Sequence, residues 1–127
     1  MDKNSLPDAL KRTVMEFFED ISENIPMERA DREDLVLVKF FFQRLLATNV
    51  MSHAITKLVP LKKEIQDRKK DFFIEQRNIL FQGLPQDRVD RFANIVTSSA
   101  LADDDLEPLW HYMDTMIALA ESYKKLC

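Results

Sequence analysis

A single glycine, Gly83, occurs in the 127 residues of this chain, and this scarcity restricts the possible folds more than any other feature. Tight β-hairpins and loops that cradle phosphate groups need several residues with positive φ, which glycine adopts most easily. The sequence therefore argues against a P-loop, a dinucleotide-binding fold and an all-β sandwich. With 46% hydrophobic and 31% charged residues, the composition is that of a folded domain. We expect one helical domain over residues 1–127.

The most apolar segment, Leu35–Leu46, contains three consecutive phenylalanines, Phe40 to Phe42. Successive helical residues are about 100° apart, so these three side chains cover more than half of the helix circumference. A surface helix keeps one apolar stripe, so a helix that is apolar most of the way round is expected to be buried on several sides. A core strand is the alternative, but Ala47 to Leu58 continue with helical spacing and without glycine or proline. We predict an all-α bundle of five or six helices around this buried central helix.

The apolar stripe changes direction near Thr48 and Asn49, which are both weak helix formers. The stripe before this point and the stripe after it lie about 160° apart on a helical wheel. Either the helix breaks here and Asn49 caps a new one, or a single long helix contacts different neighbours at its two ends. We favour a continuous, kinked helix. The side chains that we predict to be in the core are Val38, Phe41, Phe42, Leu45 and Trp110.

Other helices are indicated by capping residues and by apolar stripes. Ser5 is a good N-cap with Pro7 in the first turn, and Pro26 is expected to end that first helix. A charged helix is expected over residues 61–81, with Gly83 at its C-terminal end, and a short helix follows Pro85. The last helix is expected to begin at Asp103–Asp105, where three carboxylates favour the positive end of the helix dipole.

The charges are segmented along the chain. Residues 1–34 contain 5 basic and 10 acidic residues, residues 35–98 contain 11 and 6, and residues 99–127 contain 2 and 6. The three segments therefore carry net charges of −5, +5 and −4 within a total of −4. These charges could neutralise one another within one chain, which we favour, or between two chains in a homodimer.

Residue patterns for catalysis or metal binding are not convincing. Glu107 and His111 share a helical face, but Asp103–Asp105 are explained by capping, and His53 has no acidic neighbour in the sequence. The single cysteine, Cys127, is the last residue and indicates a reducing compartment. No uncharged run approaches the ~20 apolar residues of a membrane span, and the first seven residues lack the apolar core of a signal peptide. We expect no enzyme activity, no catalytic residue, no metal and no cofactor, and a protein that is neither secreted nor membrane-bound.

Two stretches in the C-terminal half are arranged in a way that resembles a known group of proteins. One runs from Leu58–Lys62 through Asp71–Phe73 to Asn78–Phe81, and the other from Leu101–Asp105 through Leu109–Met113 to Ala118–Tyr123. Their spacing resembles that of small, largely uncharacterised proteins of large nucleocytoplasmic DNA viruses. The resemblance implies a helical viral protein made in the host cell cytoplasm or carried in the virion. It implies no catalytic residues.

Together these observations predict a non-enzymatic helical interaction or scaffold protein, as a minor virion component or an adaptor. The expected partner is a protein, and a second copy of the chain is one candidate. The charged helix has few apolar residues with which to dock, so it could project and expose an apolar patch at its far end. The residues that we predict to bind a partner are therefore Lys62, Lys63, Lys69, Lys70, Phe72 and Phe73. The alternative function is a nucleic-acid-associated accessory protein that uses the basic residues within 57–77, although interleaved carboxylates oppose phosphate binding.

Overall fold

In a computed structural model, residues 3–25, 27–68, 71–76, 78, 86–97 and 103–126 are described. Four longer helices dominate, namely α1 (Leu6–Asn24), α2 (Arg29–Arg44), α7 (Gln86–Val96) and α8 (Asp103–Lys125). Between α2 and α7 the chain forms α3 (Ala47–His53), a π-helical turn (Ala54–Leu58), a 3₁₀ turn (Val59–Leu61), α4 (Lys62–Gln66) and α5 (Phe72–Glu75). Within these ranges no strand occurs, and the prediction of an all-α domain is confirmed.

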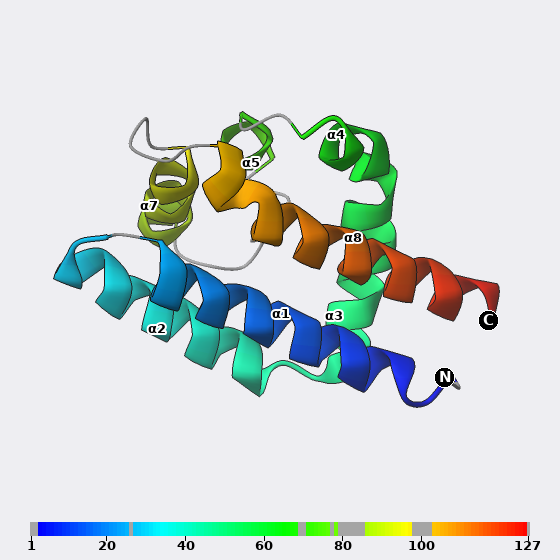
Figure 1. Cartoon of the computed structure of the whole chain (residues 1–127). Helices are drawn as coiled ribbons and strands as arrows, with labels where there is room; N and C mark the ends of the chain where they lie inside the picture. Colours follow the sequence, from blue (N-terminus) through cyan, green and yellow to red (C-terminus); the bar gives the residue numbers. More distant parts are fainter. Residues whose placement is uncertain are drawn as a thin grey trace.

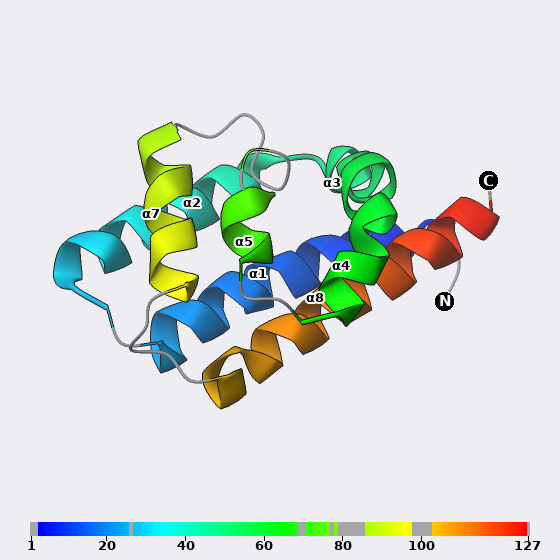
Figure 2. The ribbon, with the colours of Figure 1, turned by 90° about the horizontal axis from the view of Figure 1, so that it is seen from above.

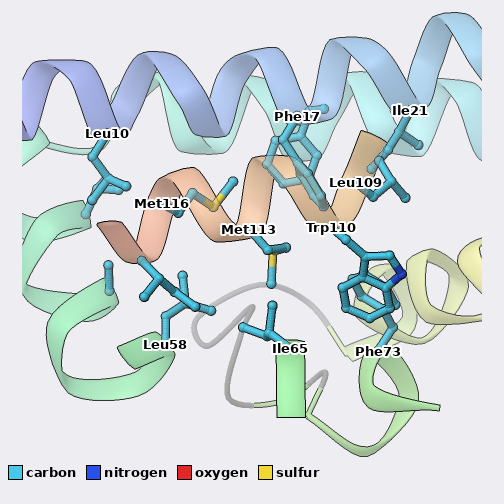
Figure 3. Close-up of a cluster of buried hydrophobic side chains, with 14 of the residues drawn as sticks. Leu10, Phe17, Ile21, Leu58, Ile65, Phe73, Leu109, Trp110, Met113 and Met116 are labelled. Carbon is cyan, nitrogen blue, oxygen red and sulfur yellow. The ribbon is translucent and has the colours of Figure 1, made fainter. Parts of the chain in front are cut away.

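The centre of the bundle is formed by α1 and α8, which make the most extensive contact in the fold. They lie side by side and antiparallel, so that both ends of the chain are at the same end of the molecule (Figures 1 and 2). Leu10, Phe17 and Ile21 of α1 face Leu109 and Met113 of α8 in Figure 3, and all five are buried. The apolar stripes of these two helices therefore make the main layer of the core.

The ends of α1 follow the signals in the sequence. Ser5 occupies the predicted N-cap position, although its side chain makes no capping hydrogen bond, and Pro7 lies in the first turn as predicted. The helix ends at Asn24, and Ile25 is extended with φ −100° and ψ 123°, the conformation favoured before a proline. At the other end of the chain, α8 begins at Asp103 and places Lys124 and Lys125 in its last turn, where they favour the negative end of the dipole.

The prediction of a buried central helix at Leu35–Leu46 was wrong. Helix α2 lies at the edge of the bundle, where it packs against α1 and α7 (Figure 1). Val38 is buried, as predicted, whereas Phe42 and Leu45 are only partly buried and Phe41 is exposed. The reason is that α1 and α8 already bury each other, so α2 has neighbours on one side only.

The preference for one continuous helix was also wrong, because the chain breaks at Leu45 and Leu46, shortly before Thr48, and Asn49 lies inside α3 instead of capping it. The backbone is extended at Leu45 (ψ 144°) and Leu46 (ψ 138°), and the axis turns by 106° before α3. Lys11 Nζ donates hydrogen bonds to the carbonyl oxygens of Gln43 (2.8 Å) and Leu45 (2.7 Å), which satisfies acceptors that the end of α2 leaves without intrahelical partners. The break explains the change in stripe direction, because the segments before and after it face different neighbours.

Pro60 explains the π-helical turn that follows α3. A proline has no N–H to donate, and its ring clashes with the carbonyl four residues earlier, which distorts a regular α-helix. The amide of Val59 instead donates to the carbonyl of Ala54, five residues back, so the helix is widened one residue before the proline. Ala54 and Leu58 of this segment are buried, and the segment packs against α8.

The single charged helix expected over 61–81 is interrupted. Helix α4 ends at Gln66, and Arg68 adopts the left-handed conformation with φ 56° before α5 begins at Phe72. This conformation costs a non-glycine residue roughly 1–2 kcal/mol, and it reverses the chain so that Ile65 and Phe73 are both buried. Ile79–Phe81 and Gly83, which we expected at the end of that helix, lie outside the described residues.

A small apolar cavity of about 70 Å³ remains in the core between α1, α3 and α8. Its walls include Leu10, Val50, Ala54 and Met116, and His53 lies at its edge. The pocket is partly open to the surface, and its almost wholly apolar wall indicates that the side chains around it are not fully packed.

Candidate interaction surface on helix α2

The two sides of α2 differ in their surroundings although both are apolar. Leu35 and Val38 are buried on the side that faces α1 and α7. On the opposite side four large side chains remain in solvent, namely Val36 (41% exposed), Leu37 (46%), Phe40 (53%) and Phe41 (37%). At 100° per residue these four lie within an arc of about 140°. We call this set of residues the α2 outer face.

The α2 outer face is a continuous apolar surface rather than a group of isolated residues. Phe40 is four and three positions from Val36 and Leu37, and Phe41 is four from Leu37, which are the spacings at which helical side chains are neighbours. The rings of Phe41 and Phe42 meet edge to face with centroids 5.9 Å apart, so Phe41 is partly held by the inner side of the helix. A contiguous apolar patch of this kind on a protein surface marks a contact site.

Polar contacts fix α2 to the rest of the bundle. Lys39 Nζ forms an ion pair with Glu19 Oε1 of α1 at 2.6 Å. Arg32 donates a hydrogen bond to the carbonyl oxygen of Ser22, also in α1. Along the other edge of the buried side, Arg91 of α7 pairs with Asp34. This bond raises the pKa of the Arg91 guanidinium. The α2 outer face is therefore presented by a helix that is held along both edges.

The predicted apolar patch at Phe72 and Phe73 was wrong, because both side chains are buried. Their ring centroids lie 6.0 Å and 4.9 Å from the ring of Trp110 in α8. Figure 3 shows Phe73 and Trp110 stacked against each other in the core. The physical reason is that α5 packs beside α7 and brings both rings to Trp110 of α8, so this segment does not project.

The structure describes two of the four predicted lysines, and one of these two is paired with a carboxylate. Lys62 on α4 is exposed but forms an ion pair with Glu121 of α8, Nζ to Oε1, at 3.0 Å. Lys63 is exposed on the same helix, and Lys69 and Lys70 lie outside the described residues. The charges of the basic segment are thus shared, at least at Lys62, with carboxylates of the last helix.

Arg68 is the most extensively bonded of the basic residues that the structure describes in this region. Its guanidinium donates to both carboxylate oxygens of Asp114, at 3.2 Å and 2.5 Å, and to the carbonyl oxygen of Trp110 at 3.5 Å. It also lies 5.8 Å from the centre of the Trp110 ring. The hydrogen bond to Asp114 raises the pKa of the Arg68 guanidinium, against a smaller opposing effect of burial. These contacts stabilise the left-handed turn between α4 and α5.

Neutralisation within one chain, which we favoured, is supported by four ion pairs that join the basic middle segment to the acidic ends. Lys39 and Arg91 pair with Glu19 and Asp34 of residues 1–34. Lys62 and Arg68 pair with Glu121 and Asp114 of residues 99–127. Because all four pairs are partly exposed, each contributes little to stability, and their main effect is on how the helices are arranged.

Groups with possible chemical roles are dispersed. Glu107 and His111 form the expected pair on one helical face, with 3.2 Å between Oε1 and Nε2, and both are exposed. In the ranges that the structure describes, no three His, Cys, Asp or Glu side chains are close enough to hold a metal ion. Tyr112 is partly buried beside Phe17, and burial, together with the nearby Asp20 carboxylate, raises the pKa of its phenol.

The α2 outer face was not among the predicted partner-binding residues. The apolar circumference of Leu35–Leu46 predicts burial in the core instead. A signal for the other interpretation is the pair of opposite charges at Glu33 and Arg44, which lie on the middle line of the outer stripe. A helix buried on all sides would not have charged residues at the centre of an apolar stripe at both of its ends.

Comparison of the chain with protein-family models, with curated proteins and with solved structures gave no match. Among the described residues no single helix is long and apolar enough to cross a membrane, whereas the bent pair Arg29–Arg44 and Ala47–Gln66 would be by length and composition alone.

Proposed function

We propose that this chain is a non-enzymatic helical protein that acts through protein contacts, and that the α2 outer face is its contact surface. The observation that supports this proposal is the exposure of Val36, Leu37, Phe40 and Phe41 on one side of an anchored helix. Burying apolar surface contributes about 25 cal/mol per Å², so these four side chains would stabilise a complex substantially. A helix that is already fixed loses little conformational entropy when it binds.

The charges around the face favour a protein over a lipid surface or a nucleic acid. Basic residues (Arg29, Arg32, Arg44) and acidic residues (Asp31, Glu33, Asp34) both lie on this helix. A membrane-surface helix usually has a basic polar side, and a phosphate-binding surface needs a contiguous cluster of basic residues. A surface with mixed charges around an apolar centre is typical of a protein interface.

The resemblance of the C-terminal half to small proteins of large nucleocytoplasmic DNA viruses supports a viral origin. We therefore propose that the protein is a minor virion component or an adaptor in the host cell cytoplasm. Mass spectrometry of purified virions separates these roles, because a virion component is present at constant stoichiometry and an adaptor is absent.

Site-specific photo-crosslinking in the producing cell tests the contact surface. A photoreactive phenylalanine analogue replaces Phe40 in one variant and Arg12, an exposed residue of α1, in the control. We expect one defined crosslinked protein from position 40 and only background from position 12. Equal background at both positions would contradict the proposal.

Retention on duplex DNA tests the alternative function. If retention decreases with salt and is weakened by Lys62→Glu with Lys63→Glu, the basic residues within 57–77 are the functional surface instead. We expect no specific retention, since Lys62 is already paired with Glu121.

A further inference from the structure

We propose that the partner of the α2 outer face is a second copy of this chain, with the two α2 helices antiparallel across a twofold axis. The inference rests on the proposed function, because it identifies the occupant of the same surface. It follows from the order of charged and apolar residues along α2. When two copies of this helix lie antiparallel, opposite charges meet at the ends and small apolar side chains meet rings in between.

The stripe reads Glu33, Val36, Leu37, Phe40, Phe41 and Arg44 along the helix. A twofold axis between Val38 and Lys39 keeps each residue on its own flank of the contact, so Val36 lies beside the second copy's Phe40 and Leu37 beside its Phe41. The same axis sets Glu33 opposite the second copy's Arg44. At 100° per residue Glu33 and Arg44 differ by only about 20° around the helix, so both point toward the copy. Each small aliphatic side chain thus meets a ring, and each end of the contact has opposite charges.

Charge order selects the antiparallel arrangement. Two antiparallel copies form two Glu33–Arg44 pairs, one at each end of the apolar contact. Two parallel copies would place Glu33 beside Glu33 and Arg44 beside Arg44, which is unfavourable at both ends. A symmetric dimer requires a surface that complements itself, and this stripe meets that condition.

Both charged residues are available for such pairs. Glu33 bonds to Arg29 at 3.2 Å, but the two side chains are 67% and 93% exposed, so this pair is worth little and is easily exchanged. Within the described residues Arg44 forms no ion pair. Neither residue anchors α2 to the bundle, since that is done by Lys39, Arg32 and Asp34.

The size of the contact indicates a weak dimer. From Glu33 to Arg44 the helix rises about 16 Å, so each copy contributes four apolar side chains over about three turns. Such an area is at the low end of specific protein interfaces, and we expect a dissociation constant on the order of 10 μM. Because α2 is preformed and its contacts with α1 and α7 remain, the dimer needs no rearrangement of the fold.

Exchanging the charges of Glu33 and Arg44 tests whether these two residues pair between the two copies. Sedimentation velocity is measured from about 1 μM to about 500 μM on the whole chain, Glu33→Arg, Arg44→Glu and the double variant. We expect each single change to weaken dimerisation by at least about tenfold and the double variant to restore it. A mixture of the two single variants should form a heterodimer, since both of its end pairs then have opposite charges. Far-UV circular dichroism checks that every variant is folded.

Several results would overturn the inference. A wild-type chain that remains monomeric over this range contradicts it, and so does a dimer that neither single change weakens. If the chain is monomeric while the photoreactive group at position 40 captures a different protein, self-pairing fails and the proposed function stands. If the group at position 40 captures nothing, both fail, and binding to vesicles with anionic lipid would assign the face to a membrane surface instead.

Discussion

Truncation of three phenylalanines to alanine should give three clearly different losses of stability, because the three rings differ in burial. Phe73 is fully buried and packs against Trp110 and Phe72, with ring centroids 4.9 Å and 5.6 Å away. Phe42 is partly buried, and its ring centroid lies 5.2 Å from that of Phe18. Phe40 is 53% exposed on the α2 outer face.

The expected magnitudes follow from the apolar area that each ring removes from water. A buried phenylalanine covers at least roughly 150 Å², which corresponds to about 4 kcal/mol at ~25 cal/mol per Å². We therefore expect Phe73→Ala to lower the free energy of unfolding by about 3–5 kcal/mol, including the cavity that it leaves. Phe42→Ala should cost about 2 kcal/mol, which is less than the full core value expected from the sequence, and Phe40→Ala less than about 1 kcal/mol.

Urea denaturation followed by circular dichroism measures these differences, at a protein concentration low enough to keep the chain monomeric. Equal slopes of free energy against urea would show that the variants unfold from the same kind of folded state. The reasoning is refuted if Phe40→Ala costs as much as Phe73→Ala. In that case α2 would be buried on both sides, as the sequence first suggested.

Three other predictions concern the C-terminal end of α2, the phenol of Tyr112 and the apolar cavity beside Val50. Lys11→Met removes the hydrogen bonds to the carbonyls of Gln43 and Leu45, and urea denaturation should show a loss of about 1–2 kcal/mol. The raised pKa of Tyr112 contributes stability that is complete below the unfolded phenol pKa of about 10 and is lost as pH rises through the higher folded value. Tyr112→Phe should reduce that alkaline loss in pH-dependent melting, and an unchanged profile would contradict the assignment. Val50→Ile should fill part of the apolar cavity and raise stability by about 0.5–1 kcal/mol in the same assay, whereas a loss would mean that the cavity cannot accept a methylene.

The parts of the fold that were predictable are those governed by local signals. Ser5, Pro7 and Pro26 define α1 in the sequence, and the carboxylates at Asp103–Asp105 define the start of α8. Their apolar stripes have one direction each, so the buried side was also predictable. Capping and periodicity depend on residues that are close together in the chain. For this reason one sequence was sufficient to predict α1 and α8.

The incorrect predictions all depended on contacts between distant segments. The turn at Arg68 is held by Asp114, which is 46 positions away, and no local pattern marks a left-handed arginine. Once that turn is present, Phe72 and Phe73 reach Trp110 and cannot form an exposed patch. The end of α2 is likewise fixed by Lys11, from 34 positions away.

The candidate site was missed for a related reason. A helical wheel shows that a side of a helix is apolar but does not show whether the chain itself or a partner covers it. For Leu35–Leu46 the number of apolar residues suggested complete burial, yet the bundle covers only the side of Leu35 and Val38. The opposite charges at Glu33 and Arg44 were the available sign that the other side lies in solvent.

Thiol labelling at two neighbouring valines tests most directly whether α2 presents its outer face to a partner. In a Cys127→Ser background, Val36→Cys places a thiol on the outer face and Val38→Cys places one on the buried side of the same helix. In dilute protein we expect the thiol at position 36 to react at nearly the rate of a free thiol and the one at position 38 roughly 100-fold more slowly. At high concentration the thiol at position 36 should become protected as a second copy covers it. Protection of position 36 in dilute protein, equal to that of position 38, would contradict the account.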